Sequence, residues 1–324
     1  MAGRFEPTWC LVFEVSLELG CWCLVLLRCL VLPLCVNWPE HCAVIIPCRN
    51  EARFIAKLVR EVRALLPNVI VVNDASTDAT AEQAASAGAE VISHQLAQGK
   101  GAALRTGWNR ARERGFAWAL CMDGDGQHAP ADIMKFLECA ERDDAAARTL
   151  VGQVPSPAKV SPAPTPADSQ RQPGAVAGLR QPGAAVPRSA GASLIVGNRM
   201  NEANKMPLVR RTVNRWMSRK LSALAGRELP DSQCGFRLLR LAALDRVQLR
   251  ATQFEIESEQ LLSFIAAGEP VEFVPVQVIY RAERSKIHPL RDTLRWFRWR
   301  REWLKSSARR QSGESRNTNK PSRR

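Results

Sequence analysis

The sequence predicts an α/β fold in which a mostly parallel sheet carries helices on both faces. Short apolar runs without a polar break recur between turn residues, which is typical of buried strands in a parallel sheet. Between these runs the apolar residues are three and four positions apart, as in helices. Polar residues follow the carboxyl ends of the runs, where ligands bind in open α/β sheets. Strands that alternate with helices in this way predict a parallel sheet.

The first half of the chain supplies four expected strands and three expected helices. The strands are residues 43–46, 69–72, 89–93 and 116–122. The helices are residues 54–66, 79–87 and 99–110. Pro67 stops the first helix, and Gly88 closes the second, which Ser76 or Asp78 can cap.

The second half resumes the same alternation. A helix is expected at residues 131–143, a strand at 193–196, a helix at 254–267 and a final strand at 271–280. A long helix at residues 209–224 carries an apolar stripe that predicts a buried face. The stripe consists of Val209, Val213, Trp216, Met217, Leu221 and Leu224.

The strongest local signal is the acidic turn Asp123-Gly-Asp125-Gly-Gln127, which directly follows the expected strand at 116–122. Two carboxylates at this edge of a sheet suit a hard divalent cation that bridges phosphate oxygens. An EF-hand is excluded, because position 6 is His128 and position 12 is Met134. An acidic turn without function remains the alternative for this stretch taken alone.

Two other glycine patterns do not indicate nucleotide sites. Residues 99–101, Gly-Lys-Gly, lack the spacing of a phosphate-binding loop, so an ATPase is not predicted. No G-x-G-x-x-G follows the first strand, which excludes the dinucleotide fingerprint.

Charge and cysteine content separate the ends of the chain from its centre. The net charge is +14, and residues 281–324 hold fifteen Lys/Arg against four Asp/Glu, so the basic excess lies in the tail. Such a tail suits an anionic surface. Six of the ten cysteines lie before residue 43, and no paired C-x-x-C indicates zinc. We therefore expect a cytosolic domain with reduced thiols.

Composition divides the chain into three parts. Residues 1–40 form an apolar, Cys/Trp-rich extension that is either a membrane anchor or a non-native start, since Arg28 and Pro33 interrupt its apolar stretch. The main domain spans 41–300 and is interrupted at 153–192 by an insertion rich in Pro, Ala and Gly, which predicts disorder. Residues 301–324 form a basic tail that is also expected to be disordered.

Seven segments in this order resemble one family. They are residues 47–51, 73–78, 99–101, 123–127, 197–199, 231–237 and 284–286. Together they resemble family 2 glycosyltransferases of the GT-A fold, and most closely the dolichyl- or polyprenyl-phosphate mannosyl- and glucosyltransferases. The resemblance covers about residues 42–300 without the insertion. It implies a Rossmann-like nucleotide-sugar half followed by an acceptor half.

The resemblance also implies roles for individual residues. Those that would bind the nucleotide sugar are Pro47, Glu51, Asp74, Lys100 and Asp123. Those that would hold Mg²⁺ or Mn²⁺ are Asp123, Asp125 and Gln127. Those that would bind the acceptor or its phosphate are Arg199, Gln233, Arg284 and Lys286, and Arg237 would also meet phosphate oxygens. The catalytic set would be Asp231, Arg237 and Asp125. The family often has an aromatic residue in place of Arg49 and an acid in place of Asn73, which leaves the donor base open.

The implied reaction is inverting, metal-dependent transfer of a hexose from GDP-mannose or UDP-glucose to a polyprenyl- or dolichyl-phosphate lipid. A lipid phosphate is already an anion near neutral pH, so positioning by arginines would dominate. If the acceptor is instead a hydroxyl of a glycan or glycolipid, a carboxylate must take a proton. Asp231 is the candidate in either case, as base or as orienting group. A catalytically dead basic protein that binds membrane or nucleic acid is the alternative from another class.

The segment 291–305 indicates a partner other than the substrates, namely an anionic membrane. It sets Leu294, Trp296, Phe297, Trp299 and Trp303 among basic residues, which suits an anionic bilayer interface. A helix that packs its aromatic rings on the domain explains the pattern equally well. The leading interpretation is a cytoplasmic enzyme, peripheral at the inner face of a membrane, with an N-terminal anchor possible and no nucleic-acid partner expected.

Overall fold

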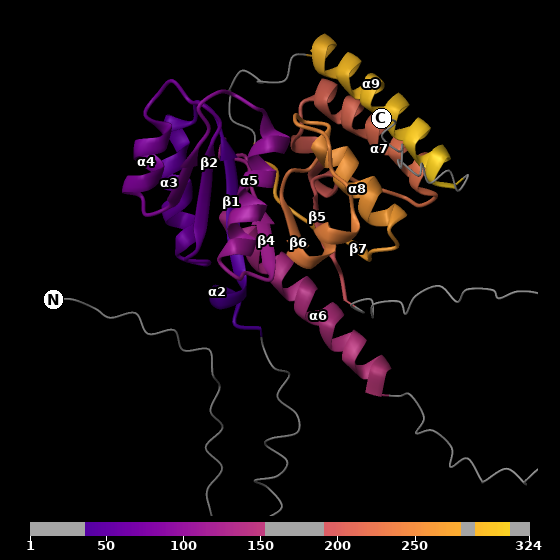
Figure 1. Ribbon diagram of the computed structural model, residues 1–324, viewed down its shortest axis with the longest axis horizontal. Helices are drawn as coiled ribbons and strands as arrows, with labels where there is room; N and C mark the ends of the chain where they lie inside the picture. Colours follow the sequence, from indigo (N-terminus) through magenta and orange to yellow (C-terminus); the bar gives the residue numbers. More distant parts are fainter. Residues whose placement is uncertain (1–35, 153–190, 280–288, 312–324) are drawn as a thin grey trace, which may run out of the picture. The chain divides into compact units, whose positions relative to one another are not determined.

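The computed structural model describes residues 36–152, 191–279 and 289–311, and it contains a seven-stranded sheet in the order β3-β2-β1-β4-β6-β5-β7 (Figure 1). All neighbouring strands are parallel except β6, which runs antiparallel to both β4 and β5. The expected α/β fold with a mostly parallel sheet is confirmed. The strands are β1 Cys42–Cys48, β2 Val69–Asn73, β3 Glu90–Ser93, β4 Trp118–Cys121, β5 Leu194–Asn198, β6 Arg237–Arg240 and β7 Val271–Pro275.

Helices cover this sheet, because every residue of β1 and of β2 is buried, as in strands covered on both faces. Helices α7, α8 and α9 gather at the end of the molecule that holds β5 and β7 (Figure 1). The helices are α2 Trp38–His41, α3 Ala52–Arg63, α4 Thr80–Ser86, α5 Lys100–Glu113, α6 Ile133–Gly152, α7 Leu208–Ala225, α8 Ile256–Ala266 and α9 Pro289–Gln311, and short 3-10 turns occupy Pro130–Asp132, Met200–Lys205 and Leu241–Arg246.

Two strand expectations need correction. Strand β6 was not expected, because its sequence Arg-Leu-Leu-Arg offers only two apolar residues after a polar segment. The last strand ends at Pro275, and residues 276–279 are not in strand conformation, although the Val276 N–H still donates to the Asn198 carbonyl of β5. Of the two residues expected to cap α4, Asp78 accepts the N–H of Thr80, the first residue of the helix, whereas Ser76 Oγ accepts the N–H of Asn50.

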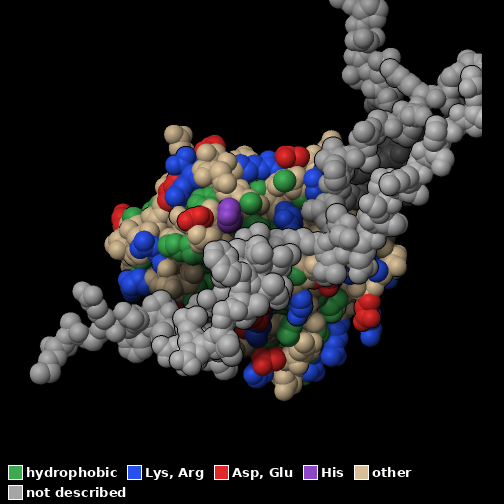
Figure 2. All heavy atoms as spheres, turned by 90° about the horizontal axis from the view of Figure 1, so that it is seen from below, with side chains coloured by type: hydrophobic (Ala, Val, Ile, Leu, Met, Phe, Trp, Pro, Cys, Tyr) green, Lys and Arg blue, Asp and Glu red, His purple; other side chains and the backbone are tan. Residues whose placement is uncertain are grey.

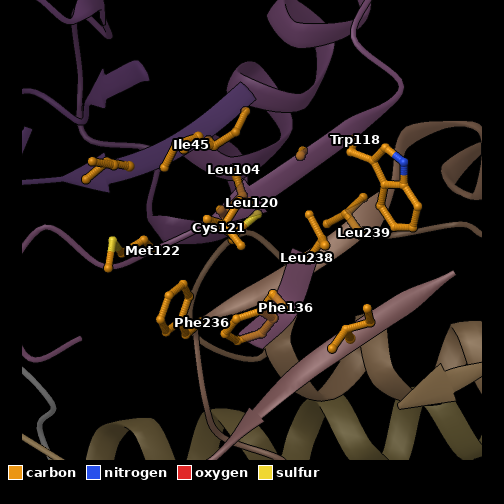
Figure 3. Close-up of a cluster of buried hydrophobic side chains, with 14 of the residues drawn as sticks. Ile45, Leu104, Trp118, Leu120, Cys121, Met122, Phe136, Phe236, Leu238 and Leu239 are labelled. Atoms are coloured by element: carbon orange, nitrogen blue, oxygen red, sulfur yellow. The ribbon is translucent and has the colours of Figure 1, made fainter. Parts of the chain in front are cut away.

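The core joins the strand before the acidic turn to the later motif at 231–237. Figure 3 shows Phe136 of α6 facing Phe236, beside Leu238 and Leu239 of β6. The rings of Phe136 and Phe236 are 4.4 Å apart at their centroids. The antiparallel strand β6 then lies directly against β4, so this packing fixes the 231–237 segment next to the acidic turn.

The apolar stripe of α7 is only partly buried, which corrects the expectation of a core-facing helix. Leu221 is fully buried, whereas Val209 is 77% exposed and Val213 is 46% exposed. In the part of the chain that the structure describes, no element covers the outer side of the first half of this helix.

The ends of the expected parts lie close to the limits of the described chain. Trp38, near the end of the expected extension, is buried and donates from Nε1 to Glu141 at 2.7 Å, so the domain begins before residue 41. Residues 1–35, 153–190 and 312–324 lie outside the described residues, and with them lie the expected anchor, most of the insertion and the end of the tail.

Two surface properties complete the fold. Within the described ranges, no helix combines the length and the apolar character needed to cross a bilayer. On the face drawn in Figure 2, basic and acidic side chains are mixed where the described atoms are visible. This visible surface therefore has no extended region of one charge.

Candidate active site

The acidic turn lies at the carboxyl end of β4, where the sequence places it. The Asp123 N–H donates to Nδ1 of His128 at 3.3 Å, and the Gln127 N–H donates to Oδ1 of Asp125 at 3.0 Å. A Cβ on Gly124 would approach the Glu51 side chain to 3.5 Å, so the end of β1 lies against this turn. The structure thus brings Glu51 together with both aspartates.

His128 supports the turn. Burial lowers the pKa of its imidazole, although Asp123 and Asp125 act in the opposite direction. Its ring also stacks on Phe236, with centroids 5.0 Å apart. A buried neutral imidazole that accepts a backbone N–H and packs on a core ring orders the turn.

Lys100 is the cation that lies beside the acidic turn. Its Nζ lies 2.5 Å from Oδ1 of Asp123 and 2.5 Å from Oε1 of Glu257. Burial lowers the pKa of the ammonium, but the two carboxylates outweigh burial and the pKa is raised. Asp123 responds in the opposite sense: burial raises its pKa, yet Lys100 and His128 hold the pKa well below its usual range. Both groups are therefore charged at neutral pH.

Gly235 is required beside this ion bridge. A Cβ at that position would lie 2.6 Å from Oδ2 of Asp123 and 2.8 Å from Nζ of Lys100. These distances are shorter than van der Waals contact, so a side chain at position 235 would displace the Asp123 carboxylate and the Lys100 ammonium from their present positions. The glycine of the later motif and the acidic turn therefore form one site.

Asp74 holds the chain that precedes Lys100. Its Oδ1 accepts the N–H of Gln98 at 2.8 Å, and its Oδ2 accepts the N–H of Gly99 at 2.8 Å. Nδ1 of His94 lies 2.9 Å from Oδ1. Burial alone raises the pKa of Asp74, but these hydrogen bonds outweigh it and the pKa is lowered. The contacts assign Asp74 to positioning the start of α5, in addition to any contact with a nucleotide.

The first N–H groups of α5 are already bonded. Gly101 and Ala102 donate to the Thr252 carbonyl at 2.8 and 3.3 Å. A Cβ on Gly101 would lie 2.4 Å from the carbonyl oxygen of Ala251, so the glycine serves packing against the segment at 251–253. This agrees with the expectation that residues 99–101 are not a phosphate-binding loop.

Asp231 and Arg199 form a buried bidentate pair. Arg199 donates from Nε to Oδ2 at 2.8 Å and from a terminal nitrogen to Oδ1 at 3.0 Å. Asp231 is fully buried and also accepts from Asn214 Nδ2 and from the Gln233 N–H. Burial raises the pKa of the carboxyl, but Arg199 and the hydrogen bonds outweigh burial and lower the pKa. A carboxylate in these surroundings is a poor proton acceptor.

Arg237 differs from its expected contact with phosphate. It is buried, with 2% of its surface exposed. Its guanidinium donates to the carbonyls of Ser232, Cys234 and Glu257 and to the amide oxygen of Gln260 at 2.7 to 3.0 Å. A guanidinium held by four protein acceptors positions the segment at 231–237 and has no exposed side for a phosphate.

Gln233 belongs to a chain of hydrogen bonds that reaches the last helix. Its Nε2 donates to Ser232 Oγ at 3.0 Å and to Ser258 Oγ at 3.1 Å. Trp296 of α9 donates from its indole to the same Ser258 oxygen at 3.2 Å. Ser232 is in turn bonded to Ser218 of α7. Residues of α7, α8 and α9 together hold the segment that carries Asp231 and Gln233.

The expected metal ligands fit a cation that arrives with a diphosphate. Among the residues described, no group of three or more His, Cys, Asp and Glu side chains forms a self-sufficient metal cluster. Asp123 and Asp125 nevertheless offer partly exposed oxygen ligands, and Mg²⁺ commonly uses one or two carboxylates plus substrate phosphates and water. The ammonium of Lys100 already occupies a cation position beside Asp123. Gln127 Oε1 lies 3.4 Å from Arg210, so it is the least available of the three.

The model of the family described as glycosyl transferase family 2 matches residues 43–172. Residues 43–172 of this chain are therefore a glycosyltransferase family 2 domain. This match confirms the expectation of a glycosyltransferase, and the mixed seven-stranded sheet has the expected α/β architecture.

Relatives of this glycosyltransferase are known from archaea and bacteria. It is 26% identical to the UDP-N-acetylglucosamine–dolichyl-phosphate N-acetylglucosaminyltransferase of Methanococcus voltae, over 73% of this chain and 84% of that protein. It is 33% identical to the undecaprenyl-phosphate mannosyltransferase of Micrococcus luteus, over 31% of this chain and 44% of that protein. A solved structure of Mycobacterium tuberculosis glucosyl-3-phosphoglycerate synthase aligns with a TM-score of 0.49 and 17% identity, over 80% of this chain and 75% of that chain, which is too weak to support a functional inference.

The structure brings together some, but not all, of the site residues that the sequence predicts. The fold brings together Glu51, Lys100, Asp123, Asp125 and Gly235 on the donor side and Arg199, Asp231 and Gln233 on the other side. Pro47 is buried within β1, two residues before the exposed Arg49. Arg284 and Lys286 lie outside the described residues.

The sequence did not predict the residues that fix the site side chains in place through hydrogen bonds and an ion pair. Asn214 and Ser218 are buried polar residues of α7. Polar residues inside an apolar helical pattern are a sequence feature that could have indicated their role in the site. Ser258 and Trp296 carry no motif of their own. Glu257 resembles an ordinary first-turn acid of a helix, and only the fold reveals that it binds Lys100.

Proposed function

We propose that this glycosyltransferase transfers a hexose, with inversion, from GDP-mannose or UDP-glucose to a polyprenyl- or dolichyl-phosphate lipid. The observation that supports the acceptor class is the buried ion pair between Asp231 and Arg199. A hydroxyl acceptor needs a carboxylate that takes a proton, and a lipid phosphate does not. The lowered pKa of Asp231 makes it a poor base, which favours the acceptor that is already an anion.

The other carboxylates near the site are also poor candidates for a base. Asp123 and Glu257 share Lys100, so both are neutralised and hydrogen-bonded. Glu255 lies 3.4 Å from Arg295. Asp125 is partly exposed and accepts the Gln127 N–H, and we assign it to the metal. This leaves positioning as the main task of the protein in the chemical step.

In the proposed reaction an oxygen of the acceptor phosphate attacks the anomeric carbon of the sugar. The bond from that carbon to the donor diphosphate breaks, and the nucleoside diphosphate leaves with the electron pair. Attack opposite the leaving group inverts the anomeric carbon. Asp231 orients Arg199 toward the acceptor, and Lys100 keeps Asp123 in position below the donor.

The metal would be Mg²⁺ or Mn²⁺, held by Asp123 and Asp125 with Gln127 nearby. When bound, a divalent cation would neutralise negative charge on the departing diphosphate. The partly exposed carboxylates and the close approach of Gly235 support a site for a cation shared with the substrate.

We further infer that the enzyme works in the cytoplasm, peripheral at the inner face of a membrane, with segment 291–305 meeting anionic lipid. Relatives whose names include dolichyl or undecaprenyl phosphate support a membrane-borne acceptor. The described cysteines are free and buried, which supports a reducing compartment; they are Cys42, Cys48, Cys121, Cys139 and Cys234.

A transfer assay with labelled donors tests the proposal. The full chain is incubated with GDP-mannose, UDP-glucose or UDP-N-acetylglucosamine, with Mn²⁺, and with either a polyprenyl phosphate or a glycolipid that offers only hydroxyl groups. We expect label from one hexose donor in the organic phase with the polyprenyl phosphate, and loss of that label in Asp125→Ala. Transfer to the hydroxyl acceptor alone would contradict the proposed acceptor class.

A further inference from the structure

Exposed apolar side chains of this protein are concentrated on two neighbouring helices. Of the ten large hydrophobic side chains that are exposed in the described part of the chain, seven lie on α7 and α9. We call these seven the α7–α9 surface: Leu208, Val209, Val213, Trp216, Leu294, Phe297 and Leu304.

The two helices form one continuous surface. Figure 1 shows α7 and α9 side by side at the same edge of the molecule. The rings of Trp216 and Phe297 are in contact, with centroids 5.6 Å apart, and Trp216 also lies 5.5 Å from Trp296. Along α7, Val209, Val213 and Trp216 follow one another at four- and three-residue spacing, which puts them on one side of the helix.

This surface differs from the one that the tryptophans of the tail suggest. Trp296 is buried, and Trp299 and Trp303 are half-buried against the core. Leu294 is 68% exposed and Phe297 is 44% exposed, so these two residues carry the outward apolar side of α9. The larger contribution comes from α7, which sequence patterning assigned to the core.

Positive charge surrounds the apolar side chains. Helix α7 contains five Lys/Arg and no acidic residue, and α9 contains eight Lys/Arg and two acidic residues. Arg215, Arg219 and Lys220 of α7 are exposed, as are Arg298 and Arg301 of α9. Apolar side chains that enter the headgroup boundary beside exposed bases match an anionic bilayer, and a protein partner of ordinary composition would not require this charge.

The inner sides of the same helices hold the catalytic segment. Asn214 donates to Asp231 at 3.0 Å, and Ser218 is bonded to Ser232. Trp296 reaches Gln233 through Ser258. A membrane that meets the outer side is therefore one helix diameter away from the residues proposed to meet the lipid phosphate.

We propose that the α7–α9 surface is a docking site for an anionic lipid bilayer. The proposal builds on the proposed function, because it names where an enzyme with a lipid-phosphate acceptor meets the membrane. It requires no acceptor lipid and no donor for binding. Docking and transfer can therefore be tested separately.

Vesicle flotation of the full chain tests the docking surface. The vesicles contain phosphatidylcholine with or without phosphatidylglycerol, and no polyprenyl phosphate. The double variant Val209→Glu, Leu294→Glu places acids on both helices at positions that are 77% and 68% exposed. The matched control is Leu96→Glu, because Leu96 is 78% exposed but lies outside α7 and α9.

We expect the wild type and Leu96→Glu to float with the phosphatidylglycerol vesicles, and the double variant to bind at least about tenfold more weakly. High salt should weaken wild-type binding. Equal binding by the double variant would overturn the proposal, as would equal binding to neutral and anionic vesicles. Light scattering without vesicles supplies another decisive result: a dimer that the double variant dissociates would identify a second copy as the occupant.

Transfer measured in detergent with a soluble short-chain polyprenyl phosphate separates this proposal from the proposed function. We expect the double variant to keep wild-type transfer in detergent while it loses vesicle binding. Vesicle binding that survives in both variants, together with normal transfer, would overturn the docking surface and leave the proposed function standing.

Discussion

Replacing Lys100 by Met tests whether one ammonium joins the donor side of the site. Its side chain is 13% exposed and contacts Asp123 and Glu257, both at 2.5 Å. Removing one partner of a buried pair leaves charge without compensation and costs about 3–5 kcal/mol. For a domain of this size, each kcal/mol lowers the midpoint of thermal unfolding by roughly 2–4 °C, so we expect a decrease on the order of 10 °C.

The matched control is Lys57→Met. Lys57 pairs with Glu61 at 3.6 Å, but its side chain is 69% exposed. Exposed i,i+4 pairs contribute about 0.3–0.5 kcal/mol, so the control should unfold within about 2 °C of the wild type. Thermal unfolding followed by tryptophan fluorescence measures both variants. Equal midpoints for Lys100→Met and Lys57→Met would refute the ion bridge.

The pH dependence gives a second check on the same bridge. The pKa of Lys100 is raised above its ordinary value of 10.5, so its contribution to stability is fully present below that pH. The contribution is lost as the pH rises from there through the higher pKa of the folded state. The difference in unfolding free energy between wild type and Lys100→Met should therefore be constant from neutral pH to about pH 10 and should shrink above it. A difference that grows in alkali would contradict the assignment of Lys100 as the bridging cation.

Three further variants test other contacts of the site. Gly235→Ala puts a methyl group 2.6 Å from Asp123 and should weaken nucleotide binding about tenfold or more, measured by calorimetry with Mn²⁺; unchanged binding would refute the close approach. Asp231→Asn should lose the stability that the lowered pKa of Asp231 supplies above its ordinary value of 3.8, so unfolding midpoints of variant and wild type should converge as the pH falls below that value. Trp296→Phe removes the hydrogen bond to Ser258 and should lower kcat about threefold to tenfold with little change in donor KM, whereas a purely structural role predicts lower stability without this split.

The strands of the donor half could be predicted because burial on both faces leaves them continuously apolar. β1 and β2 are of this kind, and each lies within one or two residues of its expected limits. β6 could not be predicted in the same way, because Leu238 and Leu239 gain their strand conformation from pairing with β4 and β5. The exposure of the apolar residues of α7 could not be predicted from their spacing either, because an apolar stripe is compatible with a protein core and with a lipid surface.

For the site, the sequence indicated which residues take part, but only the folded structure shows which residues they contact. Asp231 was expected as base or orienting group, and the buried pair with Arg199, 32 residues away along the chain, favours the second role. Arg237 was expected at a phosphate, but four protein acceptors surround its guanidinium. Lys100 and Glu257 are 157 residues apart, and no local pattern could connect them.

From the charges of the described site we expect that substrate binding requires a cation from outside this set. Lys100 is compensated by Asp123 and Glu257, and Arg199 by Asp231. A donor diphosphate and an acceptor phosphate would bring several negative charges into a site where Lys100 and Arg199 already pair with carboxylates, and uncompensated charge in a buried site is costly. A divalent cation with Asp125 supplies compensation on the donor side. On the acceptor side, the resemblance assigns the same task to Arg284 and Lys286, beyond the described residues. We therefore expect donor binding to depend on metal and acceptor binding to depend on these two residues, because the buried pairs cannot supply either charge without breaking the contacts that hold the site together.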